Sequence, residues 1–261
     1  MKLKTVACIL TAALLALGTP SCNATADRET LTQISTINAL MAGAYDGVTT
    51  AAEVKKYGDF GIGTFTALDG EMVELDGRIY QIKADGDAYA VPDAAGMPFA
   101  AVTYFDTDRS LSLPADMDYA SLQQYIDGLL PTENIFYAFK ITGNFSYMKT
   151  RSVPAQSKPY PHLVEATANQ AIFEFYNIEG TLVGFRCPSY VNGVNVPGYH
   201  LHFLTSDKDG GGHVLDFRVM NATAEIDYTS EFRMILPGEG SEFYGLNFTT
   251  ASSGDLEKAE R

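Results

Sequence analysis

The chain has 261 residues, with Lys+Arg 18 against Asp+Glu 32, a formal net charge of −14 and a sequence pI near 4.6. A surface this acidic repels phosphate, which argues against nucleic acid as a partner. Hydrophobic residues make up 46% of the chain and charged residues 19%, so the composition excludes a disordered protein and predicts a buried core.

The amino terminus has the pattern of an export signal. A basic start, "MKLK", precedes the apolar run "TVACILTAALLALG" and the small residues of "TPSCNATAD". The apolar run is too short for a membrane anchor, which needs roughly 20 apolar residues. We therefore expect residues 1–26 to be cleaved, and the mature protein to be periplasmic, a cell-envelope lipoprotein or secreted.

Two cleavage sites compete within this signal. Residues 24–26, "ATA", form a small-x-small site, whereas Ser21-Cys22 resembles a relaxed lipoprotein box, which we favour. Any membrane attachment is then expected through a lipid on Cys22 alone. Since Cys8 is lost with the signal, Cys187 remains as the one ordinary thiol, and we expect it to be a buried packing residue without a disulfide.

The first half of the mature chain begins with helix signals and continues with strand signals. Residues 36–44 and 50–58 each predict a short helix, the first with Thr36 near its cap and the second with Gly58 as its stop. Residues 61–86 contain two Asp-Gly turn signals, Asp69-Gly70 and Asp76-Gly77, between alternating apolar residues. This pattern predicts a β-meander.

Three further segments complete this half: a buried strand over 98–105, the best helix of the chain over 114–130 and a strand over 134–153. Residues 154–170 have three prolines and no strand period, which predicts a connection between two halves. The chain thus predicts a sheet-dominated α/β (α+β) fold. Its two closely packed halves, 27–165 and 166–261, are expected to have mixed or antiparallel sheets and a few short helices. The polar tail from residue 252 is expected to be frayed.

Three of the four histidines lie in one short segment, "GYHLHFLTSDKDGGGHVLDF". In a strand, His200 and His202 point to the same face, and the apolar residues between and around them point to the other. The Gly-rich loop returns the chain, so we expect His213 to begin an antiparallel partner strand and to approach the other two from the side. The fourth histidine, His162, follows a proline and is expected to be structural.

Three converging imidazoles make a metal site, and three protein ligands leave a position for water or substrate. This spacing also occurs in cupins and other metal-binding β proteins. It therefore predicts a metal-binding site but does not indicate which reaction the site supports. Zinc is favoured, although imidazole also suits copper, iron, nickel and cobalt.

Several segments in chain order make the pattern more specific: "YGDFGIGTF", "LDGEMVELDGRIYQ", "TRSV", "GTLVGFRCPSYVNGVNVPGYHLHFL" and "GGHVLDF". Together they resemble the bacterial α-acetolactate decarboxylases, from about residue 30 to the end. The resemblance implies a zinc enzyme that converts (S)-2-acetolactate to (R)-acetoin and carbon dioxide, with the metal chelating the substrate ketone and hydroxyl as an electron sink. It also implies a homodimer.

Carried onto this sequence, the resemblance implies the zinc ligands His200, His202 and His213. It further implies four active-site residues: Thr64, Glu71, Arg151 and a glutamate of the tail, for which Glu260 is chosen and Glu257 is the fallback. Two other functions remain open, an exported zinc-dependent hydrolase or cupin-like enzyme and a lipoprotein that binds metal or ligand without catalysis.

Overall fold

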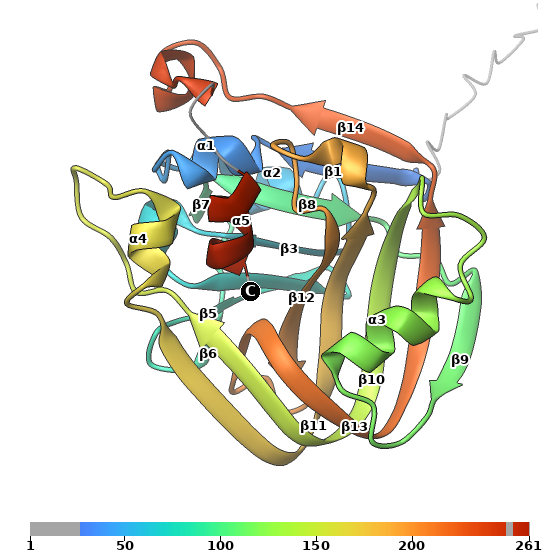
Figure 1. Ribbon diagram of the computed structural model, residues 1–261. Helices are drawn as coiled ribbons and strands as arrows, with labels where there is room; N and C mark the ends of the chain where they lie inside the picture. The colour runs from blue at the N-terminus through green and yellow to red at the C-terminus, as the bar shows by residue number, and fades with distance from the viewer. Residues whose placement is uncertain (1–26, 249–252, 261) are drawn as a thin grey trace, which may run out of the picture.

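The computed structural model describes residues 27–248 and 253–260, and within them two β-sheets face each other to form the body of the protein (Figure 1). The sheet-dominated fold with few short helices is as predicted. The predicted export signal, residues 1–26 with Cys22, lies outside the described residues and stays a prediction. None of the helices in the described part has the length and hydrophobicity needed to span a bilayer.

The first sheet has seven strands in the order β14-β1-β8-β3-β4-β5-β6. Neighbours run antiparallel except β1 and β14, which are parallel. Their bounds are β1 Thr30–Ile34, β3 Phe60–Thr64, β4 Glu71–Leu75, β5 Arg78–Ile82, β6 Ala88–Ala90, β8 Phe99–Thr103 and β14 Glu231–Ile235.

The second sheet has five strands in the order β10-β11-β12-β13-β9, and β10 also pairs with β13. This extra pairing closes four of the strands into a ring, and Figure 1 shows the long strands curling around its interior. A ring of this kind leaves fewer strand edges open than a flat sheet. The bounds are β9 Arg109–Leu113, β10 Phe136–Ser152, β11 Ala171–Cys187, β12 Gly198–Thr205 and β13 Gly211–Thr229.

The predicted meander is confirmed, since β3, β4, β5 and β6 are consecutive antiparallel neighbours. Asp76-Gly77 makes the tight turn expected of it, with φ of 51° and 72° between the paired residues Leu75 and Arg78. Asp69-Gly70 does not join two strands directly, because the 3-10 turn η1 (Thr66–Leu68) precedes it in the connection from β3 to β4.

The predicted helices form, but they are shorter than expected. Thr36 caps α1 by accepting a hydrogen bond from the Ala39 amide, and α3 begins after Asp118, whose carboxylate caps the Ser121 amide. The helix expected to stop at Gly58 ends four residues earlier, at the end of α2. The bounds are α1 Ile37–Met41, α2 Ala51–Val54, α3 Tyr119–Asp127, α4 Leu163–Thr167 and α5 Ser253–Glu260.

Two segments that were expected to be irregular contain helices. Helix α4 interrupts the Pro-rich connection, and α5 forms where a frayed tail was predicted. Both pack against the apolar cluster beside α1, where Leu163, Leu256 and Ala259 are buried. Tertiary packing therefore orders these short helices, which would be marginal alone. The remaining short elements are β2 Thr49–Thr50, β7 Gly96–Met97, η2 Ser189–Val191 and η3 Glu242–Gly245.

Sheet membership does not follow the expected division of the chain at residues 165/166. Strands β9 and β10 precede this point and belong to the second sheet, whereas β14 follows it and belongs to the first. Parallel pairing of β14 with β1 brings residues about 200 positions apart into register, as in the pair Thr30 and Glu231. Such long-range pairing leaves no local period in the sequence.

The space between the sheets decides where the histidines point. One apolar cluster joins Val73 and Leu75 of β4 to Val183 and Phe185 of β11. His202 and His200 are the direct cross-strand partners of Val183 and Phe185, so both face the first sheet. Leu201 and Phe203 face the other way, into the core that α3 covers, and so supply the expected apolar backing.

Glu74 of β4 lies on the opposite face of the first sheet and is fully buried. Neither carboxylate oxygen has a hydrogen-bond partner among the described residues. Burial raises the pKa of Glu74 to about 8, and the nearby Asp59 adds to this rise while Lys55 opposes it. The folded protein therefore holds a neutral carboxyl where the unfolded chain would ionise.

We expect Glu74→Gln to stabilise the protein at alkaline pH. Because the folded pKa exceeds the unfolded pKa, wild type loses stability as pH rises from about 4.5 to about 8. The free energy of unfolding of the variant should exceed that of wild type by roughly 3.5 kcal/mol more at pH 8 than at pH 5. Urea titrations at the two pH values measure this, with exposed Glu179→Gln as the control. An equal difference at both pH values would contradict it.

Candidate metal centre and active site

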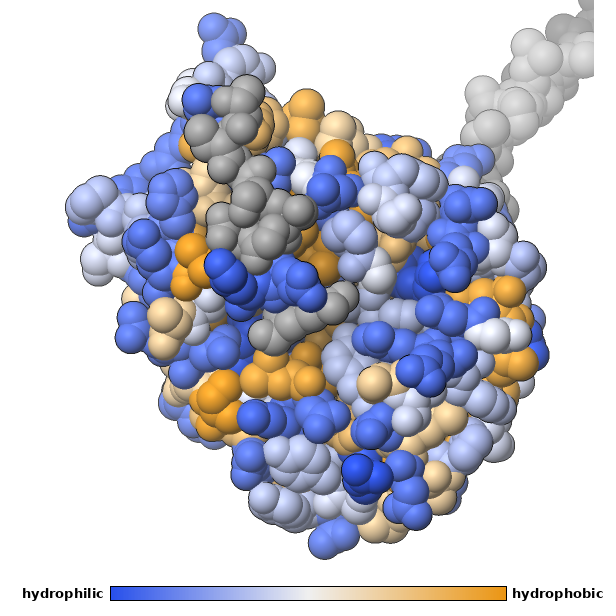
Figure 2. All heavy atoms as spheres, in the orientation of Figure 1, coloured by the Kyte–Doolittle hydropathy of each residue, from blue (hydrophilic) through white to orange (hydrophobic). Residues whose placement is uncertain are grey.

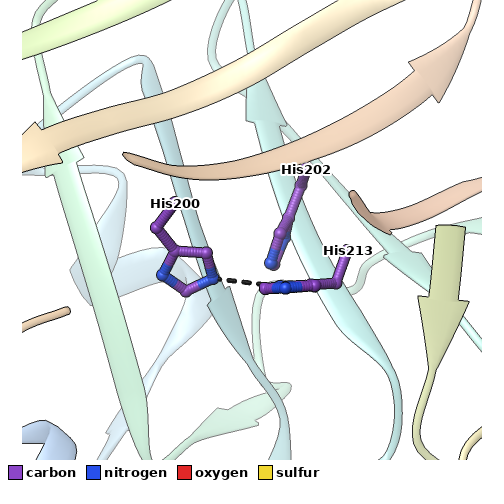
Figure 3. Close-up of side chains that lie close together, drawn as sticks. All are labelled: His200, His202 and His213. Atoms are coloured by element: carbon purple, nitrogen blue, oxygen red, sulfur yellow. Dashed lines mark hydrogen bonds between the residues drawn. The ribbon is translucent and has the colours of Figure 1, made fainter. Parts of the chain in front are cut away.

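The three clustered histidines converge from two neighbouring strands, β12 and β13 (Figure 3). His202 and His213 are direct cross-strand partners, and His200 lies two residues away on the same face. The potential ligand atoms of the three rings all lie within 4.8 Å of one another, and His200 Nε2 is 3.2 Å from His213 Nδ1. That separation fits two nitrogens bound to one zinc, which are roughly 3.4 Å apart in a tetrahedral site.

Gly212 allows His213 to take this position. Its φ is +131°, and a β-carbon added there would lie 2.5 Å from the Arg151 carbonyl oxygen. A side chain would therefore push β13 away from β10, where Arg151 and His213 are direct partners. The Gly-rich loop predicted from the sequence thus permits the close approach that aligns Arg151, His213 and His202 on three adjacent strands.

Main-chain carbonyls orient two of the rings. The Nδ1 of His202 lies 2.7 Å from the Met72 carbonyl oxygen, and the Nε2 of His213 lies 3.0 Å from that of Glu260. Because a carbonyl only accepts, both nitrogens carry the proton and donate it, which leaves the lone pairs on His202 Nε2 and on His213 Nδ1, the second of which is the hydrogen-bond partner of His200 Nε2. His202 Nε2 is buried and has no hydrogen-bond partner among the described residues, as expected of a metal ligand.

All three imidazoles are neutral at physiological pH. Burial, aided by the positive charge of Arg151, lowers the pKa of His200 to about 3. Burial also holds the pKa values of His202 and His213 well below the ordinary range. A neutral imidazole is the form that binds a cation, so the donor set fits a divalent metal.

Two carboxylates and a guanidinium surround the histidine nitrogens. Arg151 Nη1 is 2.7 Å from Glu71 Oε1, and Arg151 Nη2 is 3.8 Å from Glu260 Oε2. The second oxygen of Glu71 lies 3.5 Å from His202 Nε2, and Glu260 Oε2 lies 3.4 Å from His200 Nε2. The side chains of all three charged residues are less than a tenth exposed. The structure therefore brings together the residues expected for the site.

Burial also raises the pKa values of both carboxyl groups. The pKa of Glu71 rises to about 7 because burial outweighs the opposing charge of Arg151, and the nearby Glu260 adds to the rise. The pKa of Glu260 is raised by burial as well, against the influence of Arg151. Both groups can thus exchange a proton nearer to neutral pH than an exposed carboxyl can.

Thr64 is buried on β3 directly opposite Glu71 of β4. Its hydroxyl donates to the Gly70 carbonyl oxygen at 2.7 Å. This bond ties the end of β3 to the turn that begins β4, so Thr64 fixes the start of the strand on which Glu71 lies. Thr64 also lines the pocket beside the histidines.

The pocket beside the histidines has one apolar wall. Sequence reasoning did not single out the residues of this wall, which come from helices α1 and α4, the 3-10 turn η1, strand β8 and the end of β10. Apolar positions on short helices normally indicate core, so no local signal distinguished them. The wall consists of Ile37, Leu40, Leu68, Phe99, Val153 and Leu163.

The tail contributes Glu260 to the pocket, while Glu257 is exposed on α5 and lines a neighbouring groove. His162 is exposed before α4 and lies outside the cluster. Cys187 is buried between the sheets, and burial raises the pKa of its thiol to about 12, which makes it unreactive. The face of the molecule that carries α5 is mostly hydrophilic, with small separate apolar groups (Figure 2).

The fold and the site define a sheet-dominated α+β protein of two facing sheets with a buried three-histidine centre that could hold a metal ion. The family model for alpha-acetolactate decarboxylase matches residues 31–250. The chain therefore belongs to the alpha-acetolactate decarboxylase family.

Individual relatives agree with this assignment. The alpha-acetolactate decarboxylase of Methanosarcina mazei is 52% identical over 89% of this chain and 81% of its own length. That of Methylococcus capsulatus is 52% identical over 80% of each chain. The crystal structure of the Bacillus subtilis alpha-acetolactate decarboxylase, 40% identical, superposes with a TM-score of 0.86 over 88% of this chain and 99% of that chain.

We expect His202→Ala to weaken zinc binding by roughly 100-fold or more, because a lost ligand costs more than a lost outer partner. Competition with a chromogenic chelator measures the affinity. His162→Ala is the matched control, since it removes a histidine outside the cluster, and it should bind zinc as wild type does. Equal zinc affinity of the two variants would show that the cluster is not the metal site.

Proposed function

We propose that this protein is a zinc-dependent acetolactate decarboxylase that converts (S)-2-acetolactate to (R)-acetoin and carbon dioxide. The observation that carries the proposal is the set of three neutral, convergent imidazoles beside a buried Arg151–Glu71 pair, which lines the same pocket as His200 and His202. Family membership supports this activity over the exported hydrolase and the purely ligand-binding lipoprotein. His200, His202 and His213 would hold the metal.

Arg151 is suited to bind the anionic substrate. Among the described residues that line the pocket, it alone has a lysine or arginine side chain. A guanidinium binds carboxylate or keto oxygens through parallel N–H donors and stays charged at any working pH. Glu71 holds this group through Nη1, so Arg151 can turn the substrate carboxylate out of the plane of the ketone.

The apolar wall opposite the charged groups serves a second purpose. Leu40, Phe99 and Leu163 offer no hydrogen bonds, so they exclude water and accept the two methyl groups of the substrate. Removal of water strengthens every electrostatic interaction within the pocket.

Decarboxylation breaks the bond between the carboxyl carbon and C2, and the electron pair moves toward the adjacent ketone. A bound divalent metal supplies Lewis-acid chemistry, which stabilises the negative charge that develops on the ketone oxygen. No thiamine or pyridoxal group is then needed as an electron acceptor.

A proton must then reach one face of the former C2 to give a single enantiomer. The carboxyl groups of Glu71 and Glu260 lie nearest to the histidine nitrogens, at 3.5 and 3.4 Å. Arg151 and the strand register of β4 fix Glu71, whereas α5 delivers Glu260. One of these two carboxyl groups donates the proton, and the other balances charge.

The direct test supplies racemic acetolactate to the purified protein and measures acetoin and carbon dioxide. We expect acetoin to form, formation to stop with a chelator and to return with added zinc. Because an enantioselective enzyme consumes one half of the racemate, acetoin should plateau at about half of the substrate supplied. Absence of acetoin at full zinc occupancy would overturn the proposal and favour the hydrolase or binding function.

Replacement of each carboxyl group separates their two roles. We expect Glu71→Gln and Glu260→Gln each to lower kcat by about 100-fold or more, the usual contribution of a placed proton donor or its charge partner. The variant that lacks the donor should also produce acetoin of reduced enantiomeric purity, which chiral chromatography measures. Glu257→Gln, on the exposed side of the same helix, should stay within about twofold of wild type. Full activity of Glu260→Gln would remove the tail carboxylate from the mechanism.

A further inference from the structure

Helix α5 bonds to the site through its main chain as well as through Glu260. Arg151 Nη2 donates to the Ala259 carbonyl oxygen at 2.9 Å, and His213 Nε2 donates to that of Glu260 at 3.0 Å. Carbonyl groups in the last turn of a helix have no partner within the helix. Two residues of the site therefore complete the carboxy-terminal end of α5, where the helix dipole is negative.

The bond to His213 decides which nitrogen of this ring can bind a metal. With Nε2 protonated and donating to Glu260, the lone pair is on Nδ1, which faces His200 Nε2 at 3.2 Å. If α5 left, this constraint on the tautomer and on the ring orientation would be lost. An undocked helix would thus lower the affinity of the histidine cluster for a cation.

Two buried apolar side chains of the described part of α5 pack against the body of the protein. These are Leu256 and Ala259, and they pack in the cluster with Leu163 and Ala166 of α4. A helix of eight residues is unstable alone in water, so it forms here because it is docked. The balance between docked and undocked states is therefore sensitive to small changes in the charge of the site.

A cation at the histidines would change that charge in favour of docking. Without it, one guanidinium, of Arg151, faces two buried carboxyl groups, of Glu71 and Glu260. A divalent ion would add positive charge beside Glu260 Oε2, which lies 3.4 Å from His200 Nε2 and 3.9 Å from His213 Nδ1. Attraction to this carboxylate and to the negative end of the helix would strengthen docking.

We propose that α5 is a positioning element whose docking is coupled to metal occupancy: the docked helix selects the metal-binding tautomer of His213, and the bound metal holds the helix in place. The coupling rests on the proposed metal function of the histidines. It is reciprocal, because two binding events that favour each other do so by the same factor. The carboxyl group of Glu260 therefore reaches the pocket when the centre is loaded.

The first test weakens the docking of α5 without changing a residue of the metal centre. Leu256→Asp places a charge in the apolar cluster, and Leu256→Met, which keeps an apolar side chain at the same position, is the matched control. We expect the zinc affinity of Leu256→Asp, measured by chelator competition, to fall roughly tenfold or more, the scale seen when a partner that orients a ligand is lost. Leu256→Met should bind zinc much as wild type does.

The second test uses the unaltered protein, so it does not depend on how the variant folds. Hydrogen exchange of the backbone amides of residues 253–260 is measured with zinc removed and with zinc added. We expect zinc to slow exchange in α5 by roughly tenfold or more. This is the same factor by which loss of the docked helix lowers the zinc affinity. Strand β8, away from the tail, should change little.

Two results would overturn the coupling: equal zinc affinities of Leu256→Asp and wild type, or equal exchange rates of α5 with and without zinc. Neither measurement uses acetolactate. A protein that shows the coupling but forms no acetoin would contradict the proposed reaction alone. A protein that forms acetoin without the coupling would contradict the role of α5 alone.

Discussion

The structure depends on the burial of ionisable groups in the space between two sheets. Glu71, Arg151 and Glu260 are each nearly excluded from solvent, and a buried charge is costly unless it is paired. Arg151 lies between the two carboxylates and contacts Glu71 directly, yet one positive charge does not neutralise two negative ones. The charges would balance if the proposed divalent cation and a singly charged anionic substrate joined them. The buried charges of the pocket are thus consistent with the proposed loaded state.

Strand register, more than loop conformation, holds these groups in place. Arg151, His213 and His202 are direct partners across three adjacent strands, and Thr64 and Glu71 are partners across two strands of the other sheet. A cross-strand pair shares one face and leaves its side chains about 5 Å apart. Strands can thus maintain the fine geometry that a metal site requires, while a single short helix, α5, supplies Glu260.

The sequence predicted the parts of this site that have a local pattern. The cluster of three histidines was predicted from the H-x-H spacing, the Gly-rich loop before β13 and the alternating residues of β12. Strand geometry fixes which of these side chains share a face. The pairing of β14 with β1 and the position of β10 in the second sheet were not predictable, since they depend on contacts between distant segments.

The roles of the tail and of the main-chain carbonyl groups could not be predicted from local sequence patterns either. A polar segment such as that around Glu257 and Glu260 has the composition of a frayed end, and the resemblance alone indicated a glutamate there. The carbonyl groups of Met72 and Glu260 orient two imidazoles, but every residue has a carbonyl group, so no residue type marks this role. Only the fold shows which of them meet a histidine.

The exchange of strands between the sheets has a consequence for how the molecule is assembled. The strands of the second sheet, β9 to β13, are consecutive, but the later β14 returns to the edge of the first sheet, so the first sheet is not a contiguous stretch of chain. Cutting the backbone at the α4 connection would leave each fragment with a layer missing strands. The two sheets should therefore unfold as one unit.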